Sequence, residues 1–332
     1  MIVNQQYLIA VLLVLILKMK LKFGQTAKTL PTKILVIGGS GRVGGSAVRS
    51  IANRFGTSVE ILVGGRKRDN WDAYMKHQNM SILKTIKFLE LDITDDVELK
   101  SIVETVDLVI HTAGPFQGIK VPNVMETALL AGKKYLDVCD DVSLSRICRS
   151  NYYTSLAQRT GGSAIISTGI WPGGSSIFAQ EVISRAGGAS NVDKVVFSFF
   201  TAGSGNAGPT ILTATFLILG ENVLTYVDGK EVLRKSATDI KVVDFGKDIG
   251  EREVVRLNLI ECESCYSSGI GNVETFFGTA PKLWNRLFVL MAQLIPQNVL
   301  RDRSMMANLA NLSLPLVRLI DKLVGSTNGK YY

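Results

Sequence analysis

The chain has 332 residues, of which 46% are hydrophobic, and a formal net charge of +8. This length suggests two domains with substantial cores, and no basic stripe with interleaved aromatic residues points to nucleic acid as a partner. Four cysteines in a chain this long exclude a disulfide framework.

Residues 1–31 form an N-terminal segment with its own composition. Residues 7–17 are continuously apolar, and Lys18, Lys20 and Lys22 follow them. The run is shorter than the roughly twenty residues that cross a bilayer, and it suits the apolar region of a targeting signal. The alternatives are a retained anchor that contacts a membrane through residues 7–23, and a gene-model artefact.

A strand, a glycine-rich turn, a helix and a second strand follow within residues 33–66. Buried strands are predicted at 33–37 and 59–63, with the helix at 46–55. Such a unit is typical of a dinucleotide-binding fold, and its glycines can be read as GxxGxxG from Gly38 or as GxGxxG from Gly39. Gly38 allows the tight turn, Gly41 lets a pyrophosphate approach the backbone, and Gly44 lets the helix pack against the strand.

Arg66 and Lys67 follow the second strand, at the position that distinguishes NAD from NADP. An NAD site usually has an acidic residue there, which holds the ribose 2′-hydroxyl. A carboxylate would repel a 2′-phosphate, whereas a guanidinium can pair with it through two hydrogen bonds. We therefore predict NADP(H) as the cofactor, with a solvated basic turn as the alternative.

The next elements are a polar helix at 70–80 and a third strand at 85–91. Asp92 follows this strand, where the turn lies beside the adenine in folds of this type, and it can accept a hydrogen bond from the adenine amino group. Thr94 or Asp95 suits the N-cap of the helix that runs to Val103. We expect Asp92 to lie near the adenine and Thr94 or Asp95 to cap the helix.

A fourth strand is predicted at 107–112, and Ala113, Gly114 and Pro115 follow it. Ligands bind at the carboxyl edge of doubly wound sheets, so the nicotinamide half of the cofactor should cross this turn. His111 lies within the strand, which favours a structural role over that of a catalytic base.

The last two strands of this sheet are predicted at 135–138 and 163–167. The first of them leads into Asp140 and Asp141, and the second leads into Trp171 and Ser175. Asp140, Asp141 and Ser175 are therefore the candidate catalytic residues, and Trp171 can line the nicotinamide. One of the two aspartates is instead expected to cap the following helix.

The second domain is predicted over residues 171–332. Its elements are helices at 176–185, 210–219, 283–294 and within 310–324, and a strand at 192–201. The glycine-rich loop at 203–209 is a plain connection or a loop that closes over a substrate. Asp228 and Gly229 predict a hairpin turn. They lie inside a match to the YxxxK pattern, but a catalytic Tyr and Lys of that pattern must lie on one face of a helix, so the turn argues against this pair.

Cys262 and Cys265 form a CxxC pair, but with no second pair a zinc site would be hard to complete, and no metal is predicted. We expect small residues in a strand or loop, with a redox pair as the alternative. The apolar stripes of the last two helices are expected to be core or dimer contacts, with a membrane-facing surface as the alternative.

Four segments, GGSGRVGG, DLVIHTAGPFQG, ALLAGKKYLDVCDD and STGIWPGGSS, occur in this order. They make the chain resemble the saccharopine dehydrogenase-like oxidoreductases. Later segments, among them FFTAGSGNAGPTILTATFLILGE and FGTAPKLWN, are similar to the branch found in cyanobacteria and plant plastids. The resemblance covers roughly residues 33–323.

The resemblance implies an NADP-binding Rossmann domain over 32–170 and a second α+β domain that closes over the cofactor. The family's second domain continues with further strands, so we expect the second sheet to be incomplete at its C-terminal end, or the gene model to be truncated. Carried over residue by residue, the cofactor contacts are Gly38, Ser40, Gly41, Arg42, Val43, Arg66, Asp92, Ala113, Gly114 and Pro115.

Two functions follow from the sequence. The first is an NADP(H)-dependent oxidoreductase that transfers hydride to or from an unidentified small molecule between the domains. The second is a non-catalytic NADP(H)-binding protein that docks to a membrane or lipid droplet; an inactive paralogue is a third alternative. A homodimer is a further expectation, as is location in a plastid or at a membrane.

Overall fold

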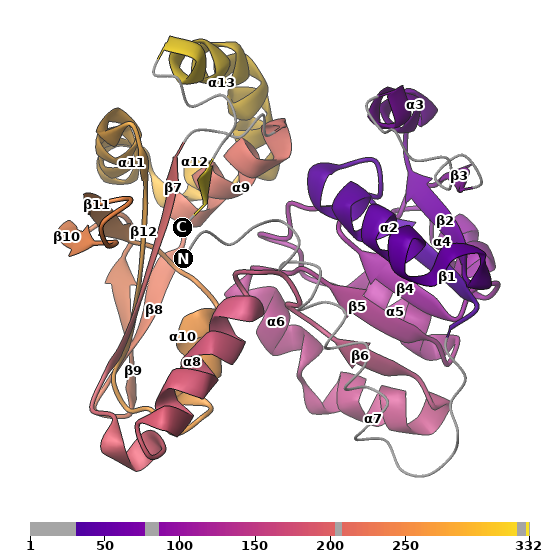
Figure 1. Ribbon diagram of the computed structural model, residues 1–332, viewed down its shortest axis with the longest axis horizontal. Helices are drawn as coiled ribbons and strands as arrows, with labels where there is room; N and C mark the ends of the chain where they lie inside the picture. Colours follow the sequence, from indigo (N-terminus) through magenta and orange to yellow (C-terminus); the bar gives the residue numbers. More distant parts are fainter. Residues whose placement is uncertain (1–30, 77–85, 203–207, 324–329, 332) are drawn as a thin grey trace.

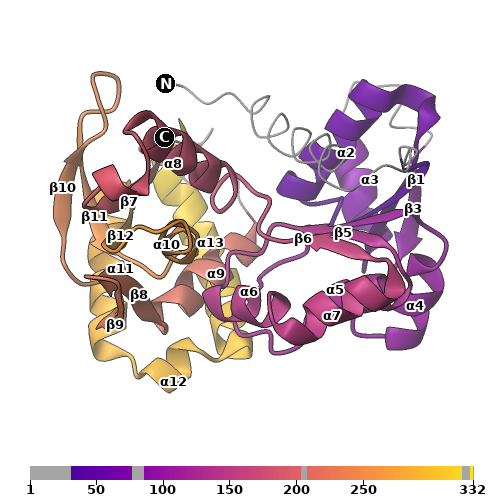
Figure 2. The same cartoon turned by 90° about the horizontal axis from the view of Figure 1, so that it is seen from below.

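The computed structural model describes residues 31–76, 86–202, 208–323 and 330–331. Two β-sheets, each with its own helices, lie beside one another (Figure 1, Figure 2). Several predictions fall wholly or partly outside the described residues: the N-terminal segment, the end of the 70–80 helix, the first residue of the 85–91 strand, most of the 203–209 loop and the last residue of the 310–324 range. No helix within the described ranges has the length and apolarity needed to span a bilayer.

The first sheet is parallel, with strand order β3-β2-β1-β4-β5-β6. Its strands are β1 (Lys33–Ile37), β2 (Glu60–Gly65), β3 (Lys87–Glu90), β4 (Leu108–His111), β5 (Lys134–Asp137) and β6 (Ser163–Ile165). This is the order of a dinucleotide-binding sheet, in which the direction of winding reverses between β1 and β4. The ligand position predicted from the sequence lies at the carboxyl ends of these two strands.

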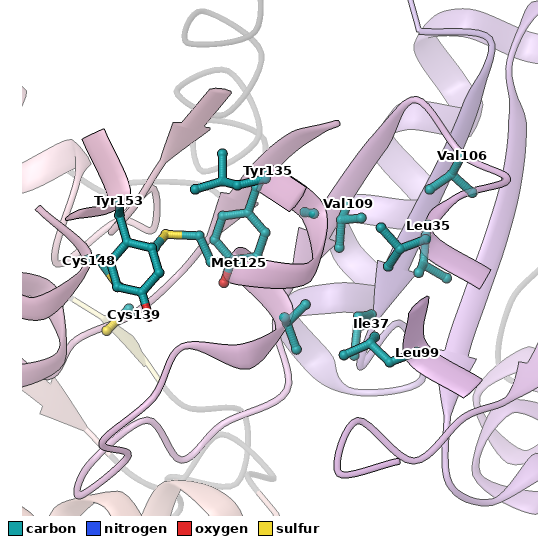
Figure 3. Close-up of a cluster of buried hydrophobic side chains, with 14 of the residues drawn as sticks. Leu35, Ile37, Leu99, Val106, Val109, Met125, Tyr135, Cys139, Cys148 and Tyr153 are labelled. Atoms are coloured by element: carbon teal, nitrogen blue, oxygen red, sulfur yellow. The ribbon is translucent and has the colours of Figure 1, made fainter. Parts of the chain in front are cut away.

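Helices cover both faces of the first sheet because its strands are apolar on both sides. One face carries α2 (Arg42–Phe55) and α3 (Arg68–Lys76); the other carries α4 (Asp96–Val103), α5 (Asn123–Leu130), α6 (Val142–Cys148) and α7 (Asn151–Thr160). Side chains of β1 alternate between them. Val36 packs in the α2 layer, whereas Leu35 and Ile37 pack with Leu99 and Met125 (Figure 3).

The second sheet contains β7 and β12 as a parallel pair, with antiparallel strands around them. The strands are β7 (Val195–Ala202), β8 (Asn222–Val227), β9 (Lys230–Lys235), β10 (Lys241–Asp244), β11 (Glu251–Arg256), β12 (Val273–Ala280) and β13 (Lys330–Tyr331). The helices are α8 (Gly174–Arg185), α9 (Pro209–Leu219), α10 (Glu261–Tyr266), α11 (Lys282–Leu294), α12 (Gln297–Leu300) and α13 (Arg303–Leu323). The predicted fold class, a Rossmann-type sheet followed by an α+β unit, is confirmed.

Most predicted elements are present with their ends shifted by a few residues. The largest shift is at α13, which begins at Arg303, seven residues before the predicted range. The helix α2 begins at Arg42, four residues early, because Gly41 is its N-cap and Gly44 and Gly45 lie inside it. The hairpin prediction is confirmed, since Asp228 and Gly229 have φ of +49° and +75° between β8 and β9.

The prediction for Cys262 and Cys265 is wrong, because both lie in the short helix α10 instead of a strand or loop. Both thiols are free and buried. Burial raises the pKa of Cys262 to about 12 and that of Cys265 to about 11. A redox pair needs a thiolate near neutral pH, so these values do not favour the redox alternative.

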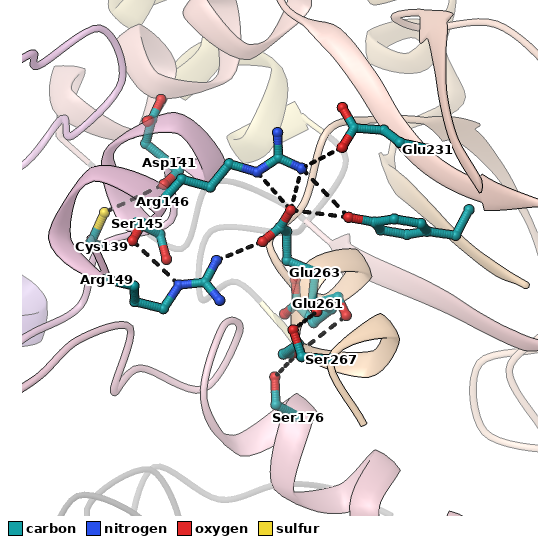
Figure 4. A network of polar contacts seen from close by, with 12 residues as sticks. Cys139, Asp141, Ser145, Arg146, Arg149, Ser176, Glu231, Glu261, Glu263 and Ser267 are labelled. Atoms are coloured by element: carbon teal, nitrogen blue, oxygen red, sulfur yellow. Dashed lines mark hydrogen bonds and ion pairs between the residues drawn. The ribbon is translucent and has the colours of Figure 1, made fainter. Parts of the chain in front are cut away.

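Glu263 of α10 joins the two parts of the molecule (Figure 4). Its carboxylate accepts hydrogen bonds from Arg146 Nε and Arg149 Nη2, each at 2.6 Å, and from Tyr226 Oη at 3.1 Å. Burial raises the pKa of Glu263, but the bonds from Arg146 and Arg149 outweigh burial and hold it below its usual range. Arg146 also pairs with Glu231 at 2.7 Å. These contacts fix α6 of the first part against the second sheet.

Candidate functional site

The turn between β1 and α2 depends on close backbone packing. Gly38 has a φ of +80°, and its N–H donates to the Gly64 carbonyl at 2.8 Å. A Cβ on Gly44 would lie 2.3 Å from the Gly38 carbonyl oxygen and 2.5 Å from Thr112 Oγ1. The helix can therefore approach the strand this closely only with glycine at position 44, as the sequence predicts. Gly39 is also buried, and a Cβ there would lie 2.9 Å from Val63 Cγ1.

The N-terminus of α2 is open. No side chain caps it, and its first turn contains no acidic residue. Among the described residues, apart from its chain neighbours and its own helix, the only atom within 4 Å of a Cβ on Gly41 would be the Gly38 carbonyl oxygen, at 3.2 Å. Uncapped N–H groups at the positive end of a helix attract phosphate, so this cradle fits a pyrophosphate. Ser40 is half-buried here, while Arg42 and Val43 are exposed.

Arg66 and Lys67 follow β2 and are exposed beside this turn. Asp92, after β3, is exposed as well, and its Oδ1 accepts hydrogen bonds from Thr94 N at 2.9 Å and Thr94 Oγ1 at 2.7 Å. These bonds, together with the charge of Arg66, lower the pKa of Asp92. Asp92 therefore shapes its own turn, and Asp95 is the N-cap of α4, accepting from Val97 N and Glu98 N.

The loop after β4 lies against the glycine turn. A Cβ on Gly38 would come within 2.9 Å of Ala113 N, and Thr112 Oγ1 donates to the Ile37 carbonyl at 2.8 Å. Ala113 is thus brought to the glycine turn, and Ala113, Gly114 and Pro115 are all half-buried.

A residue that the sequence did not single out, Arg303 of α13, fixes the far side of this loop. Its Nη2 donates to the Pro115 carbonyl at 3.1 Å, and its Nη1 donates to the Gln117 carbonyl. The second part of the molecule therefore holds the loop over which the nicotinamide half is expected to cross.

A buried chain of polar side chains lies beneath this edge of the sheet. Tyr135 Oη donates to Asp137 Oδ2 at 3.0 Å and lies 3.1 Å from His111 Nδ1. Asp137 Oδ1 accepts from the backbone N–H groups of Cys139 and Ser167 at 3.0 and 2.7 Å. Burial lowers the pKa of His111 to about 4, so the imidazole is neutral at pH 7. This agrees with the structural role expected of it.

Carboxyl groups from both parts of the molecule gather at the ends of β5 and β6. Asp140 and Asp141 follow β5, Glu261 starts α10, and Glu221 follows α9. Ser175 Oγ donates to Glu261 Oε1 at 2.7 Å, and Asn258 Nδ2 donates to Glu221 Oε2 at 2.8 Å. Asp141 is the N-cap of α6 and accepts from Leu144 N at 2.5 Å, which confirms the cap expected of one aspartate.

Burial gives this carboxyl cluster pKa values near neutrality. It raises the pKa of Asp140 to about 6 and that of Glu261, which is 1% exposed, to about 7, with the charge of Asp140 adding to the rise at Glu261. Burial and the charge of Asp141 raise the pKa of Glu221 to about 8. Such groups can hold or release a proton at physiological pH.

Sequence reasoning found Asp140, Asp141 and Ser175 but missed Glu221 and Glu261. The first three follow predicted strands of the first sheet, whereas the two glutamates come from helix ends more than forty residues further along the chain. For Glu261 the sequence offers only a glutamate that directly follows the mostly apolar residues 257–260, in LNLIECES, and this does not say which site the side chain joins. Trp171 stacks on Phe199 at 5.1 Å and Phe277 at 5.6 Å, against the second sheet.

Comparison with known proteins identifies the first part of the chain. Residues 34–170 match the protein family described as the saccharopine dehydrogenase NADP binding domain. No curated protein matches the whole sequence closely enough to serve as a relative.

One solved structure supports the fold, and a second matches more weakly. Saccharopine dehydrogenase (L-Glu forming) from Saccharomyces cerevisiae matches with a TM-score of 0.50 and 17% identity, over 74% of this chain and 54% of that protein. The chain thus spans about half of that enzyme's length. UDP-glucose 4-epimerase from Thermotoga maritima matches with a TM-score of 0.31 and 15% identity, over 59% of this chain and 66% of that protein.

The glycine cradle, the open helix N-terminus and the basic residues after β2 all lie within the matched segment. They fit a pyrophosphate and a 2′-phosphate. Residues 34–170 thus match the saccharopine dehydrogenase NADP binding domain, and this match indicates that the protein binds NADP(H).

Proposed function

We propose that the protein is an NADP(H)-dependent oxidoreductase in which the carboxyl cluster moves the proton that accompanies hydride transfer. The observation that carries the proposal is Glu261: a carboxyl group 1% exposed, with a pKa of about 7, whose partner Ser175 lies in the first turn of α8, the helix after β6. A group with this pKa is suited to general acid–base catalysis at neutral pH.

NADP(H), when bound, supplies or accepts the hydride. The glycine cradle and the α2 N-terminus hold its phosphates, Arg66 and Lys67 pair with the 2′-phosphate, and Asp92 lies toward the adenine. The loop at Ala113–Pro115, supported by Arg303, orients the nicotinamide half. These assignments agree with the exposure of the basic pair and with the contact between the loop and the glycine turn.

Side chains of the protein itself donate or accept the proton. Glu261 holds it, Ser175 orients the Glu261 carboxyl through the 2.7 Å bond, and Asp140 raises its pKa. A carbonyl, imine or alkene carbon can serve as the hydride partner, with the proton delivered to or taken from the adjacent atom. Asp141 is engaged as the α6 cap, so we assign it a positioning role.

The test is NADPH oxidation by the full chain over a panel of aldehydes, ketones, imines and enones. Glu261→Gln should lower kcat by about 10²–10⁴-fold, the usual contribution of a general acid–base group, while NADPH binding stays unchanged. Glu90→Gln, at an exposed position on β3, is the matched control. Unchanged turnover in Glu261→Gln would remove it from the mechanism.

If the wild-type chain binds NADPH but turns over nothing in the panel, the non-catalytic binding protein replaces the enzyme as the better account. Absence of NADPH binding is a different outcome, and it would rule out both the enzyme and the non-catalytic binding protein. The proposed plastid or membrane location follows only from the sequence and is tested separately, by tracking a full-length fusion protein in cells.

A further inference from the structure

We propose that the helical layer formed by α11 and α13 binds the surface of an anionic lipid bilayer. This inference is independent of the proposed catalytic function. Both helices pack on α9 around one core, which includes Phe216, Phe288 and Ala310. They lie at one end of the second part of the molecule (Figure 1).

The outward face of α13 is apolar along its length. Met305, Leu312, Leu316 and Leu319 are 49, 80, 55 and 54% exposed. Their spacing of seven, four and three residues places them in one stripe on the helix. The face that packs on α9 is a different one, formed by Met306, Ala310 and Val317, which are buried. The helix is thus apolar on two adjoining faces, of which only one has a partner among the described residues.

A second stripe lies on α11. Leu283, Leu287, Leu290 and Leu294 are 59, 37, 50 and 72% exposed, and their spacing of four, three and four residues is again that of one helix face. The opposite face of α11, with Phe288 and Ala292, is buried in the core that it shares with α13. Contiguous exposed apolar surface of this kind marks a binding face.

The charges around the two stripes select the kind of partner. Residues 282–322 contain six Lys or Arg and two Asp or Glu; of the six, Arg301 and Arg303 bond backbone carbonyls of Gly220 and Pro115. On α13, Arg318 and Lys322 are exposed. On α11, which has no acidic residue, Lys282 and Arg286 reach Glu253 at 3.5 and 3.3 Å with side chains still 68 and 66% exposed.

Leucine-rich stripes flanked by basic residues are the pattern of a helix that lies in the membrane interface. The apolar face enters the boundary between headgroups and acyl chains, and Lys or Arg side chains meet anionic headgroups. A second copy of the same positive surface would meet like charge, so charge complementarity favours anionic lipid over self-association.

The experiment places a fluorescent probe in the α13 stripe of the full chain. The four native cysteines are buried, so the thiol introduced by Leu316→Cys can be labelled selectively with an environment-sensitive dye. Leu233→Cys on β9, 58% exposed in the wild type, is the matched control. Each labelled protein is mixed with vesicles of phosphatidylcholine alone or with added phosphatidylserine. Both labelled proteins contain residues 1–31, so a shift confined to the Leu316→Cys probe reports the α13 stripe and not recruitment by that segment.

We expect a blue shift of the Leu316→Cys probe on phosphatidylserine-containing vesicles and none for Leu233→Cys. Replacing Arg318 and Lys322 with Gln should weaken partitioning roughly thirtyfold, from the contribution of each basic side chain near an anionic surface. Absence of a shift would overturn the proposal. So would an equal shift on phosphatidylcholine alone, or a shift that appears without vesicles as protein concentration rises, since the latter would identify a second copy as the partner.

Discussion

Replacing Glu261 with Gln should make the protein more stable at alkaline pH and leave its stability at acidic pH nearly unchanged. The wild-type carboxyl is 1% exposed and has a pKa of about 7, against an ordinary glutamate value of 4.5. Below pH 4.5 the group is protonated in both the folded and the unfolded chain, so burial imposes no cost. Between pH 4.5 and 7 only the unfolded chain loses the proton, and wild-type stability falls as pH rises.

The size of the effect follows from the pKa. A rise from 4.5 to about 7, at about 1.4 kcal/mol per pKa unit, corresponds to roughly 3 kcal/mol lost by pH 8. Gln carries no charge at any pH and its side-chain oxygen can still accept the bond from Ser175 Oγ, so the variant should not suffer this loss. The free energy gained by Glu261→Gln should therefore grow with pH and level off above pH 7.

The assay is urea unfolding of wild type and Glu261→Gln at several pH values from 4 to 8.5. Glu90→Gln, at an exposed position, should follow the wild-type curve throughout. A difference between Glu261→Gln and wild type that is the same at every pH would refute the argument, because it would mean that Glu261 is ionised in the folded protein or paired by a group that the structure does not place there.

Three further outcomes follow from the structure. Gly44→Ala should lower NADPH affinity and cost about 1–3 kcal/mol of stability, as overpacking does, because its Cβ would meet the Gly38 carbonyl oxygen at 2.3 Å. Gly208→Ala is the control, since a Cβ there would meet no described atom within 4 Å. Equal losses of NADPH affinity for the two variants in titration calorimetry would contradict the prediction. Glu263→Ala removes the acceptor shared by two arginines and should lower the melting temperature by the equivalent of roughly 1–3 kcal/mol; an unchanged melting temperature would mean that these ion pairs contribute nothing to joining the two parts. The buried cysteine thiols should resist a water-soluble disulfide reagent in the native protein and react fully in urea, and fast native reaction at Cys262 would contradict the raised pKa assigned to it.

The first half of the fold was open to prediction because its signals are local. The alternation of strands and helices predicts a parallel sheet. The glycine motif predicts that Gly44 must be glycine, because the helix packs directly on the strand there. Asp95 and Asp141 likewise cap helices that begin one residue later. Each of these depends on residues only a few positions apart.

The rest could not be predicted, because it depends on contacts between distant segments. Burial raises the pKa of Glu261, and the charge of Asp140, in the first part of the molecule, adds to the rise. The hydrogen-bond partner of Glu261, Ser175, lies 86 residues away along the chain. Arg303 supports the loop at Pro115 across 188 residues. Cys262 and Cys265 were misplaced because a six-residue helix has too few turns to establish a pattern.

The measurement that tests the central claim most directly is the thermal stability of the full chain with NADPH, with NADH and without nucleotide, in wild type and Arg66→Asp. Binding to the folded state at a hundredfold excess over Kd adds about 2.7 kcal/mol. A rise in melting temperature with NADPH that exceeds the rise with NADH, and that disappears in Arg66→Asp, is the predicted result. No rise with either nucleotide, or an equal rise with both in wild type, would contradict the assignment of an NADP(H) site to the glycine cradle and Arg66.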